Sequence, residues 1–353
     1  MKQKRLVVDV SNIFWRAVSA LQRYGPVDTA DSAGLGLHGC LMSLKKHYNN
    51  IKPHKLAIVF EGKQNWRKEY TKSAACVSRR LYKGNRVADP SMAVLFDVMR
   101  SFEDLARNHT NIVTLVHPRL EGDDLIGGYA DYFASPHDGS SDGDEVFILS
   151  GDKDFVQLLG NPNIHLVNPD DGLERTLTKV CDVDDAGYFM FEKCFRGDSG
   201  DNVLPALPRV RKTKLHKAYG VKDGKVDASL ADSFEMSNLL NSTWEFMDPE
   251  TGDKRMMSVA EMYEENSLLM NLRGQPQEIR DLIKEVIEHE SDNHGQFNFF
   301  NFSKFLGKYK LQQIADKSAD FVPMLSGKGF KMAATPTAEP VADEQPALGG
   351  LQF

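Results

Sequence analysis

The stretch VFILSGDKDF, residues 146–155, holds the pattern that decides the fold. Its first half is a short apolar run with β-branched residues, which predicts a buried strand. Its second half turns polar at once and places Asp152 and Asp154 directly after that strand. The stretch therefore predicts a buried strand whose carboxyl end carries two carboxylates.

Three other runs have the same character and alternate with helical patterns. The runs are LVVDV (6–10), LAIVF (56–60) and IVTLV (112–116). A helix is predicted over 91–106 by a stripe of apolar residues, namely Met92, Leu95, Phe96, Met99 and Phe102, and another over 123–134. Strands that alternate with helices predict an α/β fold with a mostly parallel central sheet flanked by helices.

Acidic residues gather at the predicted ends of these strands. Asp9 lies at the end of the first strand and Glu61 directly follows the second. The later strands are followed by Glu121, Asp123 and Asp124 and by Asp152 and Asp154. Because parallel strands end at one edge of the sheet, we expect these carboxylates to lie together there. Asp198 and Asp201, in GDSGDN, would complete the cluster if a second lobe closes over that edge.

The size of this acidic set indicates metal chemistry. A single such acid is usually a helix cap or a solvated turn residue. Many carboxylates in one place repel each other and cannot all stay ionised unless cations offset their charge. Oxygen ligands select Mg²⁺ or Mn²⁺ over zinc. The set is large enough for two ions about 4 Å apart, the arrangement that hydrolyses phosphodiesters.

A basic segment over residues 63–86 predicts contact with nucleic acid. It contains Lys63, Arg67, Lys68, Lys72, Arg79, Arg80, Lys83 and Arg86, with Trp66, Tyr70 and Tyr82 between them and Glu69 as the single acid. Cations neutralise phosphates and aromatic rings stack on bases. A solvated helix face is the alternative, but such faces usually mix charges of both signs. A second basic run, Arg209, Arg211, Lys212, Lys214 and Lys217, could grip duplex backbone.

Length and composition allow a full hydrophobic core. The chain has 353 residues, 41% of them hydrophobic, and a net charge of −7. No strong strand pattern follows residue 185, so we expect an α/β domain over 1–184 with a smaller, mainly helical lobe over 185–331. Residues 332–353 are rich in Ala, Pro, Thr and acids, which predicts a disordered tail.

The cysteines and the N-terminal residues bear on where the protein acts. The four cysteines are widely spaced without a CxxC pair, which predicts free thiols in a reducing cytoplasm rather than disulfides or a zinc site. The opening MKQKRLVVDV predicts a strand and not a signal peptide, and no apolar run approaches about 18 residues. We expect a soluble cytoplasmic protein with no membrane partner.

The motifs, taken in order, resemble the 5′-nuclease (flap endonuclease) family and in particular its bacteriophage members, the phage ribonucleases H and 5′-3′ exonucleases. The resemblance is carried by VVDVSN, VFEGKQNWRKEY, LYKGNR, LEGDDLIG, ILSGDKDF and RGDSGDN, and more faintly by ENSLLMNLRGQP (265–276). It extends over about residues 5–318. The resemblance implies a Mg²⁺-dependent enzyme with a PIN-like 5′-nuclease fold and a lobe containing a helix-hairpin-helix-like element. A phage-encoded member would act in the host cytoplasm, in DNA replication or repair.

The resemblance also implies roles for individual residues. Asp9, Glu61, Glu121, Asp123 and Asp152 would serve the catalytic metal with Asp124 close by, and Asp154, Asp198 and Asp201 would serve a second metal. Lys83 matches a lysine that contacts the scissile phosphate, Arg67 matches an arginine at the base of a helical arch, and residues 63–90 correspond to that arch. The substrates implied are DNA with 5′ ends, flaps or nicks, and RNA–DNA hybrids.

Two positions depart from the family pattern. Glu61 stands where the family usually has Asp, which lengthens the carboxylate arm. The hairpin motif, usually GIGxKT, reads PRVRKTK (208–214), with Arg209 and Arg211 at the glycine positions. The close backbone approach to duplex phosphates and the monovalent-ion site of the family are therefore not implied here, and guanidinium groups are the alternative contact.

Other functions fit the sequence less well. GLGLHG (34–39) follows no strand directly, which favours a loop entering a helix over a dinucleotide site. There is no GKS or GKT phosphate loop, and Ser11 stands where a haloacid dehalogenase phosphatase has its second Asp. A non-catalytic nucleic-acid-binding module of the same fold and a PIN-type ribonuclease remain as alternatives.

The C-terminal residues QPALGGLQF predict a docking peptide. Gln345, Leu348, Leu351 and Phe353 are spaced by three, three and two residues, after a tether rich in Ala and Pro. Large apolar side chains are unusual in a disordered tail. The pattern is similar to peptides that dock replication enzymes on a sliding clamp, so a clamp or a single-strand-binding protein is the partner we expect.

Overall fold

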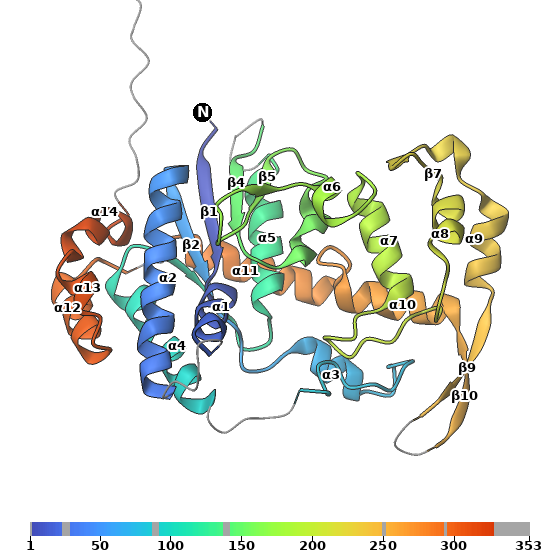
Figure 1. The fold of residues 1–353 in the computed structure, drawn as a ribbon, viewed down its shortest axis with the longest axis horizontal. Helices are drawn as coiled ribbons and strands as arrows, with labels where there is room; N and C mark the ends of the chain where they lie inside the picture. Colours follow the sequence, from blue (N-terminus) through green and yellow to red (C-terminus); the bar gives the residue numbers. More distant parts are fainter. Residues whose placement is uncertain are drawn as a thin grey trace, which may run out of the picture.

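The computed structural model describes residues 2–22, 29–86, 92–136, 142–248, 252–292 and 295–327. A central sheet with helices on both faces occupies the middle of the molecule (Figure 1). Its strands are β1 (Lys4–Asp9), β2 (Lys55–Val59), β3 (Val113–Leu115), β4 (Glu145–Leu149), β5 (Ile164–Val167) and β6 (Glu174–Arg175), in the order β3-β2-β1-β4-β5-β6. All neighbouring strands are parallel except β5 and β6. The four strands and the α/β class expected from the sequence are confirmed.

The strand order places a topological switch point between β1 and β4. The chain moves from β1 through β2 to β3 on one side, and then returns to place β4 on the other side of β1. Asp9 pairs with Val59 of β2, and Val8 pairs with Leu149 of β4. Ligands of such sheets bind outside the carboxyl ends of the strands at the switch point. Asp9 and the residues after β4 therefore occupy the favoured place for a site.

Alternate side chains of β1 enter two separate cores. Leu6 and Val8 pack with α1 (Val10–Gln22), α2 (Thr29–Ile51) and α4 (Met92–His109), whereas Val7 packs with α5 (Gly122–Ala134) and α11 (Gln277–Asp292). The apolar stripe expected for 91–106 is largely buried in α4, although Phe96 is exposed and contacts Trp15. The sheet is thus buried on both faces, as parallel strands require.

GLGLHG lies inside α2 and is not a loop. At Gly36, an added Cβ atom would lie 2.8 Å from side-chain atoms of Phe14 and Val18. At Gly39, it would lie 2.9 Å from Cβ of Ala17. These glycines let α1 approach α2, so the expectation of a loop was wrong although no dinucleotide motif is formed.

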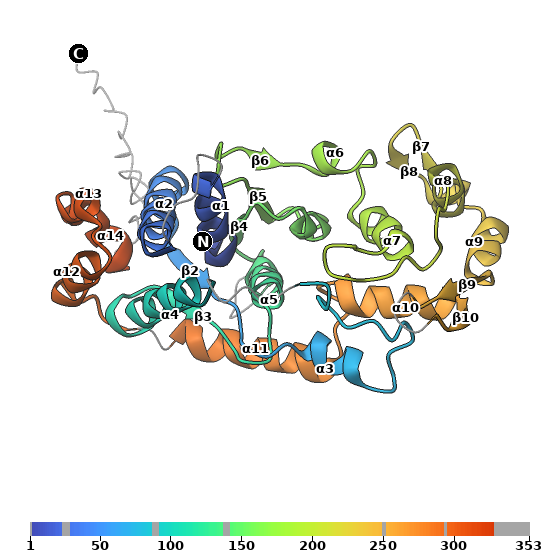
Figure 2. The same ribbon diagram turned by 60° about the horizontal axis from the view of Figure 1, so that its bottom comes forward.

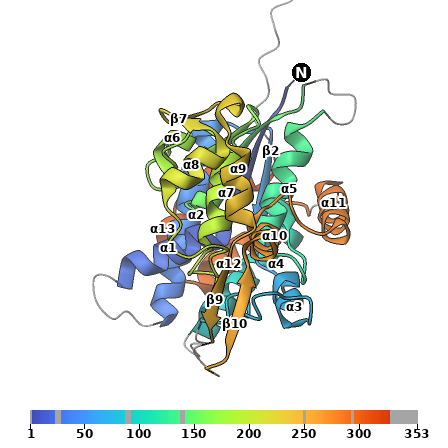
Figure 3. The same ribbon diagram turned by 90° about the vertical axis from the view of Figure 1, so that its right-hand side faces the viewer.

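The second lobe has its own apolar core. It is built from α7 (Ala186–Arg196), α8 (Lys212–Tyr219), α9 (Ser233–Leu240), α10 (Val259–Met270), and two hairpins, β7 (Val221–Lys222) with β8 (Lys225–Val226) and β9 (Thr243–Met247) with β10 (Lys254–Ser258). The sequence did not predict these hairpins. The β9–β10 hairpin extends toward the side of the molecule that carries α3 (Trp66–Lys72) (Figure 3).

The C-terminal helices belong with the sheet and not with this lobe. α11 packs against α5 and β3, and α12 (Phe299–Lys308), α13 (Gln312–Ala315) and α14 (Val322–Leu325) contribute to the core beside α2 and α4 (Figure 2). The predicted lobe over 185–331 is therefore replaced by one that ends near Met270. Short elements complete the chain: α6 (Leu177–Val180) and three 3₁₀ turns, η1 (Lys153–Leu158), η2 (Ala228–Leu230) and η3 (Ser318–Phe321).

Three sequence expectations can be set beside this fold. The four cysteines are free and buried. No helix in the described part of the chain is long and apolar enough to cross a membrane. The tail over 332–353, with Gln345, Leu348, Leu351 and Phe353, lies outside the described residues.

Candidate active site

Asp9 and Asp152 are joined through one hydroxyl group at the switch point. The Asp9 carboxylate, 7% exposed, accepts a hydrogen bond from the Asn12 backbone N–H at 2.9 Å and another from the Ser150 hydroxyl at 2.9 Å. The same Ser150 oxygen accepts the backbone N–H of Asp152 at 3.0 Å. Asp152 in turn caps η1 by accepting the Asp154 N–H at 2.8 Å. The turn after β4 therefore fixes the backbone that carries both acids beside Asp9.

The start of α5 brings a second group of acids to the same edge. Glu121 is the N-cap residue of this helix, and Asp123 and Asp124 lie in its first turn. The Gly122 N–H donates to Glu61 Oε2 at 3.1 Å, which ties the residue after β2 to the helix N-terminus. A helix N-terminus favours negative charge because its N–H groups are unpaired. Four chain segments thus converge on one acidic cluster.

Electrostatic repulsion within this cluster is evident from the pKa values. Burial, with a smaller contribution from Asp152, outweighs the two hydrogen bonds and raises the pKa of Asp9 from 3.8 to about 6. Glu61 is exposed, but desolvation of its carboxyl group by the surrounding protein, helped by Glu121, raises its pKa to about 7. Burial and four neighbouring acids, Asp152, Asp9, Glu61 and Glu121, hold the pKa of Asp123 well above its usual value. A cation placed among these carboxylates would relieve that repulsion.

The chemistry of the donors fits hard divalent cations. The candidate metal ligands at this edge are all carboxylates, the ligands that Mg²⁺ and Mn²⁺ prefer. Asp154 Oδ1 is buried and has no hydrogen-bond partner within the described residues. As the side chains stand, no group of three or more His, Cys, Asp or Glu residues in the described ranges is arranged to hold a metal ion. Two lysines form ion pairs with acids of this region, Lys83 with Glu121 and Lys193 with Asp154 and Asp198.

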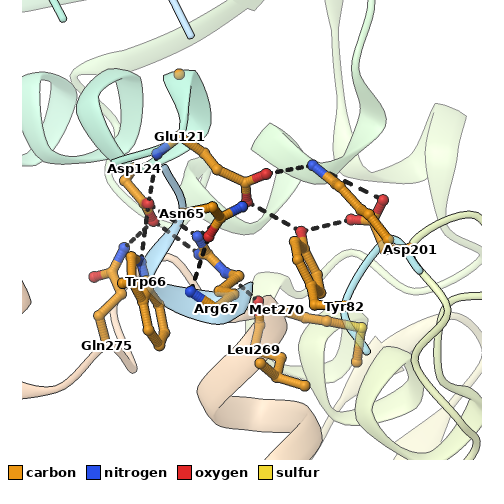
Figure 4. Close-up of polar contacts among 12 residues, drawn as sticks. Asn65, Trp66, Arg67, Tyr82, Glu121, Asp124, Asp201, Leu269, Met270 and Gln275 are labelled. Carbon is orange, nitrogen blue, oxygen red and sulfur yellow. Dashed lines mark hydrogen bonds and ion pairs between the residues drawn. The ribbon is translucent and has the colours of Figure 1, made fainter. Parts of the chain in front are cut away.

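Lys83 forms an ion pair with Glu121, and its Nζ lies 4.0 Å from Asp201 Oδ1. Burial lowers the pKa of Lys83, but Glu121 and Asp201 outweigh it and raise that pKa overall. Tyr82 donates its hydroxyl to Asp201 Oδ2 at 2.7 Å and to Glu121 Oε2 at 3.1 Å (Figure 4). The basic segment therefore lies on the acidic cluster, with Lys83 over Glu121.

Lys193, from α7, joins the two lobes at the other end of the cluster. Its ammonium group forms ion pairs with Asp154, and with Asp198 at 3.1 Å. Burial raises the pKa of Asp154 in spite of Lys193, whereas Lys193 outweighs burial at Asp198 and lowers its pKa. The sequence analysis missed Lys193 because a lysine on an amphipathic helix is usually a surface charge. The one feature of the sequence that could have indicated a role for Lys193 is its position five residues before Asp198.

Asp124 and Arg67 occupy positions that differ from those the sequence implied. Arg67 Nη2 donates to Asp124 Oδ1 at 2.7 Å, and Nη1 donates to Asp124 Oδ2 at 2.9 Å (Figure 4). Trp66 Nε1 and Gln275 Nε2 also donate to Asp124, at 3.1 and 2.9 Å. Asp124 is fully buried and Arg67 is 2% exposed. The resemblance implied a metal ligand and a nucleic-acid contact, but protein donors occupy both Asp124 oxygens and Arg67 is enclosed.

Glu121 is held by the same network. Arg67 Nη1 donates to Glu121 Oε2 at 3.1 Å, and the Glu121 N–H donates to Asp124 Oδ2 at 3.1 Å. Arg67 Nε donates to the Leu269 carbonyl of α10 at 2.6 Å. The guanidinium group thus links α3, α5 and the second lobe behind the acidic cluster.

The other basic residues of the sequence prediction remain on the surface or at its margin. Lys68, Arg79, Arg86, Arg209, Arg211 and Lys214 are exposed, and Arg80, Lys83 and Lys212 are half-buried. Residues 63–86 form one short helix, α3, followed by turns, so the described part of the expected arch is mostly non-helical. Arg209 has φ +57°, the left-handed region that favours glycine. The backbone there keeps a glycine-like conformation although the side chain is arginine.

Comparisons with known proteins identify the family of the N-terminal domain. A family model for the 5′-3′ exonuclease N-terminal resolvase-like domain matches residues 4–186. The chain is 27% identical over 217 residues to a 5′-3′ exonuclease of Buchnera aphidicola subsp. Schizaphis graminum, over 59% of this chain and 67% of that protein. It is 28% identical over 232 residues to DNA polymerase I of Streptococcus pneumoniae, over 63% of this chain but 24% of the polymerase.

Solved structures show the same fold. The T5 D15 protein co-crystallized with metal ions superposes with a TM-score of 0.51 at 14% identity, over 82% of this chain and 99% of that one. A variant of the bacteriophage T5 D15 flap endonuclease, in a pseudo-enzyme–product complex with DNA and metal ions, gives a TM-score of 0.53 at 15% identity, over 82% and 100%. With its N-terminal domain matched over more than half of the chain, this protein belongs to the 5′-3′ exonuclease family of nucleases.

Proposed function

We propose that this protein is a Mg²⁺-dependent 5′-3′ exonuclease and flap endonuclease that hydrolyses phosphodiester bonds near 5′ ends. One observation carries the proposal: acids from four segments share one sheet edge, and repulsion with burial raises the pKa of three of them, Asp9, Glu61 and Asp123. A structural role would not call for so many carboxylates together, since each raises the cost of ionising its neighbours.

The residues present could hold two divalent ions, and Mn²⁺ could replace Mg²⁺. Asp9, Glu61, Glu121, Asp123 and Asp152 would hold the first, and Asp154, Asp198 and Asp201 the second. When bound, such ions activate a water molecule and stabilise the leaving oxygen of a phosphodiester. Asp124 is left out of this set because Arg67, Trp66, Gln275 and the Glu121 N–H engage its oxygens. Its role is to orient Glu121 through Arg67.

Lys83 would act on the scissile phosphate. Its ammonium group lies on Glu121 and near Asp201, so it stands beside acids that would hold the metal ions to which a phosphate would bind. A fixed cation there stabilises charge that develops on the phosphate oxygens, without reorganising during the reaction. Tyr82 holds the backbone of this segment close to the same two acids.

Two surfaces would bind the nucleic acid backbone. Around the site, Lys68, Arg79, Arg80 and Arg86 supply positive charge, and this charge is what phosphates bind. On the second lobe, α8 begins at Lys212 and its N-cap residue, Arg211, makes no side-chain capping bond. Its first-turn N–H groups, with Arg209, Arg211, Lys212 and Lys214 around them, suit a phosphate of the duplex.

Preferred substrates are flaps, nicks and 5′ ends of DNA, and RNA–DNA hybrids such as primers, in phage DNA replication or repair. The first alternative, a non-catalytic module of the same fold, would bind these structures without cutting them. The second, a PIN-type ribonuclease, would cut RNA and leave DNA intact. The same assay separates all three.

The test uses flap, nicked and RNA–DNA substrates labelled at the 5′ or the 3′ end, with and without Mg²⁺. We expect short products released from the 5′ end, only with the metal. Products released from the 3′ end alone, or equal cleavage in the presence of a chelator, would contradict the proposal.

The C-terminal peptide with Gln345, Leu348, Leu351 and Phe353 stays a prediction from sequence. Docking on a sliding clamp or a single-strand-binding protein would raise the local concentration of the nuclease at a junction. A chain that ends at Lys331 should keep its activity on short oligonucleotides and lose stimulation by the clamp. Normal stimulation of that chain, with no binding of a 340–353 peptide, would remove the docking hypothesis.

A further inference from the structure

Glu265 is a buried carboxylate with no cation beside it. It lies on α10 and is 3% exposed, and none of the ion pairs between described residues includes it. Burying an ionised carboxylate is costly unless hydrogen bonds compensate. The donors that compensate here all come from the basic segment, about 190 positions earlier in the chain.

The bonds to Glu265 gather one short loop. The backbone N–H groups of Val77 and Ser78 donate to its two carboxylate oxygens, the second at 3.1 Å. The Tyr70 hydroxyl donates to Oε2 at 3.3 Å, and the Cys76 thiol lies 3.9 Å from Oε1. Backbone N–H groups bonded to a carboxylate make strong, charge-assisted hydrogen bonds. Glu265 therefore fixes the backbone of residues 76–78 to the second lobe.

The β9–β10 hairpin holds the same loop from its other side. Arg255 Nη2 donates to the Ser78 carbonyl at 3.1 Å, and its guanidinium group lies 5.4 Å from the centre of the Phe246 ring. Ser78 thus has both backbone polar groups bonded to side chains of the second lobe. The hairpin and the basic segment are therefore in contact, which the sequence did not predict (Figure 3).

The far end of the segment is held by a different kind of anchor. Tyr82 and Lys83 bond to Glu121, and Tyr82 and Arg86 bond to Asp201. Arg79, just before this end, and Lys83, within it, have φ values of +53° and +54°. Such conformations are uncommon for residues with a side chain and persist where surrounding contacts impose them. The segment is therefore fixed at 76–78 by Glu265. At its far end it is held by acids of the candidate site and also by backbone contacts, since the Lys83 N–H donates to the Asp201 carbonyl at 2.8 Å and Asn202 Nδ2 donates to the Leu81 carbonyl at 2.9 Å.

We propose that Glu265 is the positioning residue of the basic segment: it fixes residues 76–78 to the second lobe, so that Lys83 is carried at a set distance from the acidic cluster. This rests on the function proposed above, in which Glu121 and Asp201 exchange their bonds to the segment for ligands. The anchor at Glu265 takes no part in that exchange, and neither does the bond from the Lys83 N–H to the Asp201 carbonyl, so the backbone of the segment stays in place while its side-chain contacts change.

Glu265→Ala tests this role, with Glu264→Ala as the control because Glu264 is the adjacent, exposed acid on the same helix. Misplacing Lys83 should lower single-turnover cleavage of a 5′-labelled flap by about 10²-fold, while the dissociation constant for flap DNA stays within about threefold. The cleavage rate of Glu265→Gln, which keeps an acceptor oxygen, should lie between those of the wild type and Glu265→Ala. Trypsin should cut after Arg79 and Arg80 faster in Glu265→Ala than in the wild type or the control.

Amide hydrogen exchange of the unaltered chain gives a test that no folding defect can obscure. The N–H groups of Val77 and Ser78 should exchange slowly, and their protection should not change when Ca²⁺ and flap DNA are added. Fast exchange at 77 and 78, or unaltered trypsin cleavage and turnover in Glu265→Ala, would overturn the proposal. Absence of any cleavage by the wild type would instead refute the proposed function, and the trypsin and exchange results would still decide the role of Glu265.

Discussion

Arg67 and Asp124 are joined by two parallel hydrogen bonds, 2.7 and 2.9 Å long, in the interior between α3 and α5. Two-pronged pairing of this kind fixes both groups in direction as well as distance. Because the same guanidinium group also binds Glu121 and the Leu269 carbonyl, the pair sets the position of one active-site acid relative to the second lobe.

This pair predicts a large loss of stability when one partner is removed. Arg67→Ala should lower the free energy of unfolding by about 3–5 kcal/mol, because it leaves the buried Asp124 charge unpaired. The double variant Arg67→Met with Asp124→Leu should lose less stability than Arg67→Ala, because it leaves no buried charge unpaired. Urea denaturation measures both. Equal losses in the two variants would show that the unpaired charge is not the cause.

Lys83 and Arg79 should affect different steps. Lys83→Ala should lower kcat by about 10²–10³-fold, because its charge acts on the phosphate in the transition state. Arg79→Ala should leave kcat unchanged, weaken DNA binding and reduce the slope of log K against log salt by about 0.9. Single-turnover kinetics with binding titrations at several salt concentrations separate these outcomes. A change in KM alone for Lys83→Ala would place its ammonium group away from the scissile phosphate.

Lys193 should compete with a divalent cation for Asp154 and Asp198. Its ammonium group pairs with both acids, so replacing it leaves two carboxylates without their counter-charge. Lys193→Met should therefore bind Mn²⁺ more tightly, or bind one more ion, than the wild type. Lys153→Met is the control, because Lys153 lines a cavity of about 420 Å³ together with Lys193 and Asp198 and forms no ion pair with a described residue. Calorimetry that finds the same affinity and stoichiometry in all three proteins would contradict this competition.

The acidic cluster should make the metal-free protein less stable as the pH rises. The pKa of Asp9 is raised from 3.8 to about 6 and that of Glu61 from 4.5 to about 7. A carboxyl group whose pKa is raised by folding binds more protons in the folded chain, so its contribution is complete below the unfolded pKa and is lost as pH rises through the folded value. The window is therefore about pH 4 to 7.

Three histidines make the stability rise with pH instead, because burial lowers the pKa values of His47, His117 and His216. The effect of the acids must therefore be separated from that of the histidines. The useful quantity is the Tm of the wild type minus that of Asp9→Asn, measured without metal across this pH window. We expect the difference to fall as the pH rises, and Mg²⁺ to reverse the fall. A difference that grows with pH would mean that Asp9 is stabilised as a carboxylate by contacts other than a metal.

Local sequence patterns were sufficient to predict the strands β1 to β4 and the acidic edge of the sheet, but not β5 and β6. Strands such as 146–150 are short, apolar and bounded by polar residues, and the acids that follow them must meet if the strands are parallel. Nothing in that argument depends on long-range contacts. The same reasoning placed Asp9, Glu61, Asp123 and Asp152 at one edge, as the structure shows.

The features that the sequence did not predict depend on contacts between residues that are far apart in the chain. Arg67 was expected on the surface because it lies among seven other cations, but two acids of α5 and the Leu269 carbonyl enclose it. Glu265 and Lys193 have no local signal, because each depends on a partner from a distant part of the chain. The hairpin β9–β10 alternates exposed and half-buried residues without a strong apolar run, which hid it from a search for buried strands.

The most direct measurement of the central claim compares Asp152→Asn with Asp170→Asn on a 5′-labelled flap in Mg²⁺. Asp152 lies in the acidic cluster after β4. Asp170 follows the neighbouring strand β5, is exposed and forms an ion pair with Arg16. We predict that Asp152→Asn cleaves at least about 10³-fold more slowly while binding the flap within about threefold of the wild type, and that Asp170→Asn is unchanged. Undiminished cleavage by Asp152→Asn would contradict the assignment of this cluster as the active site.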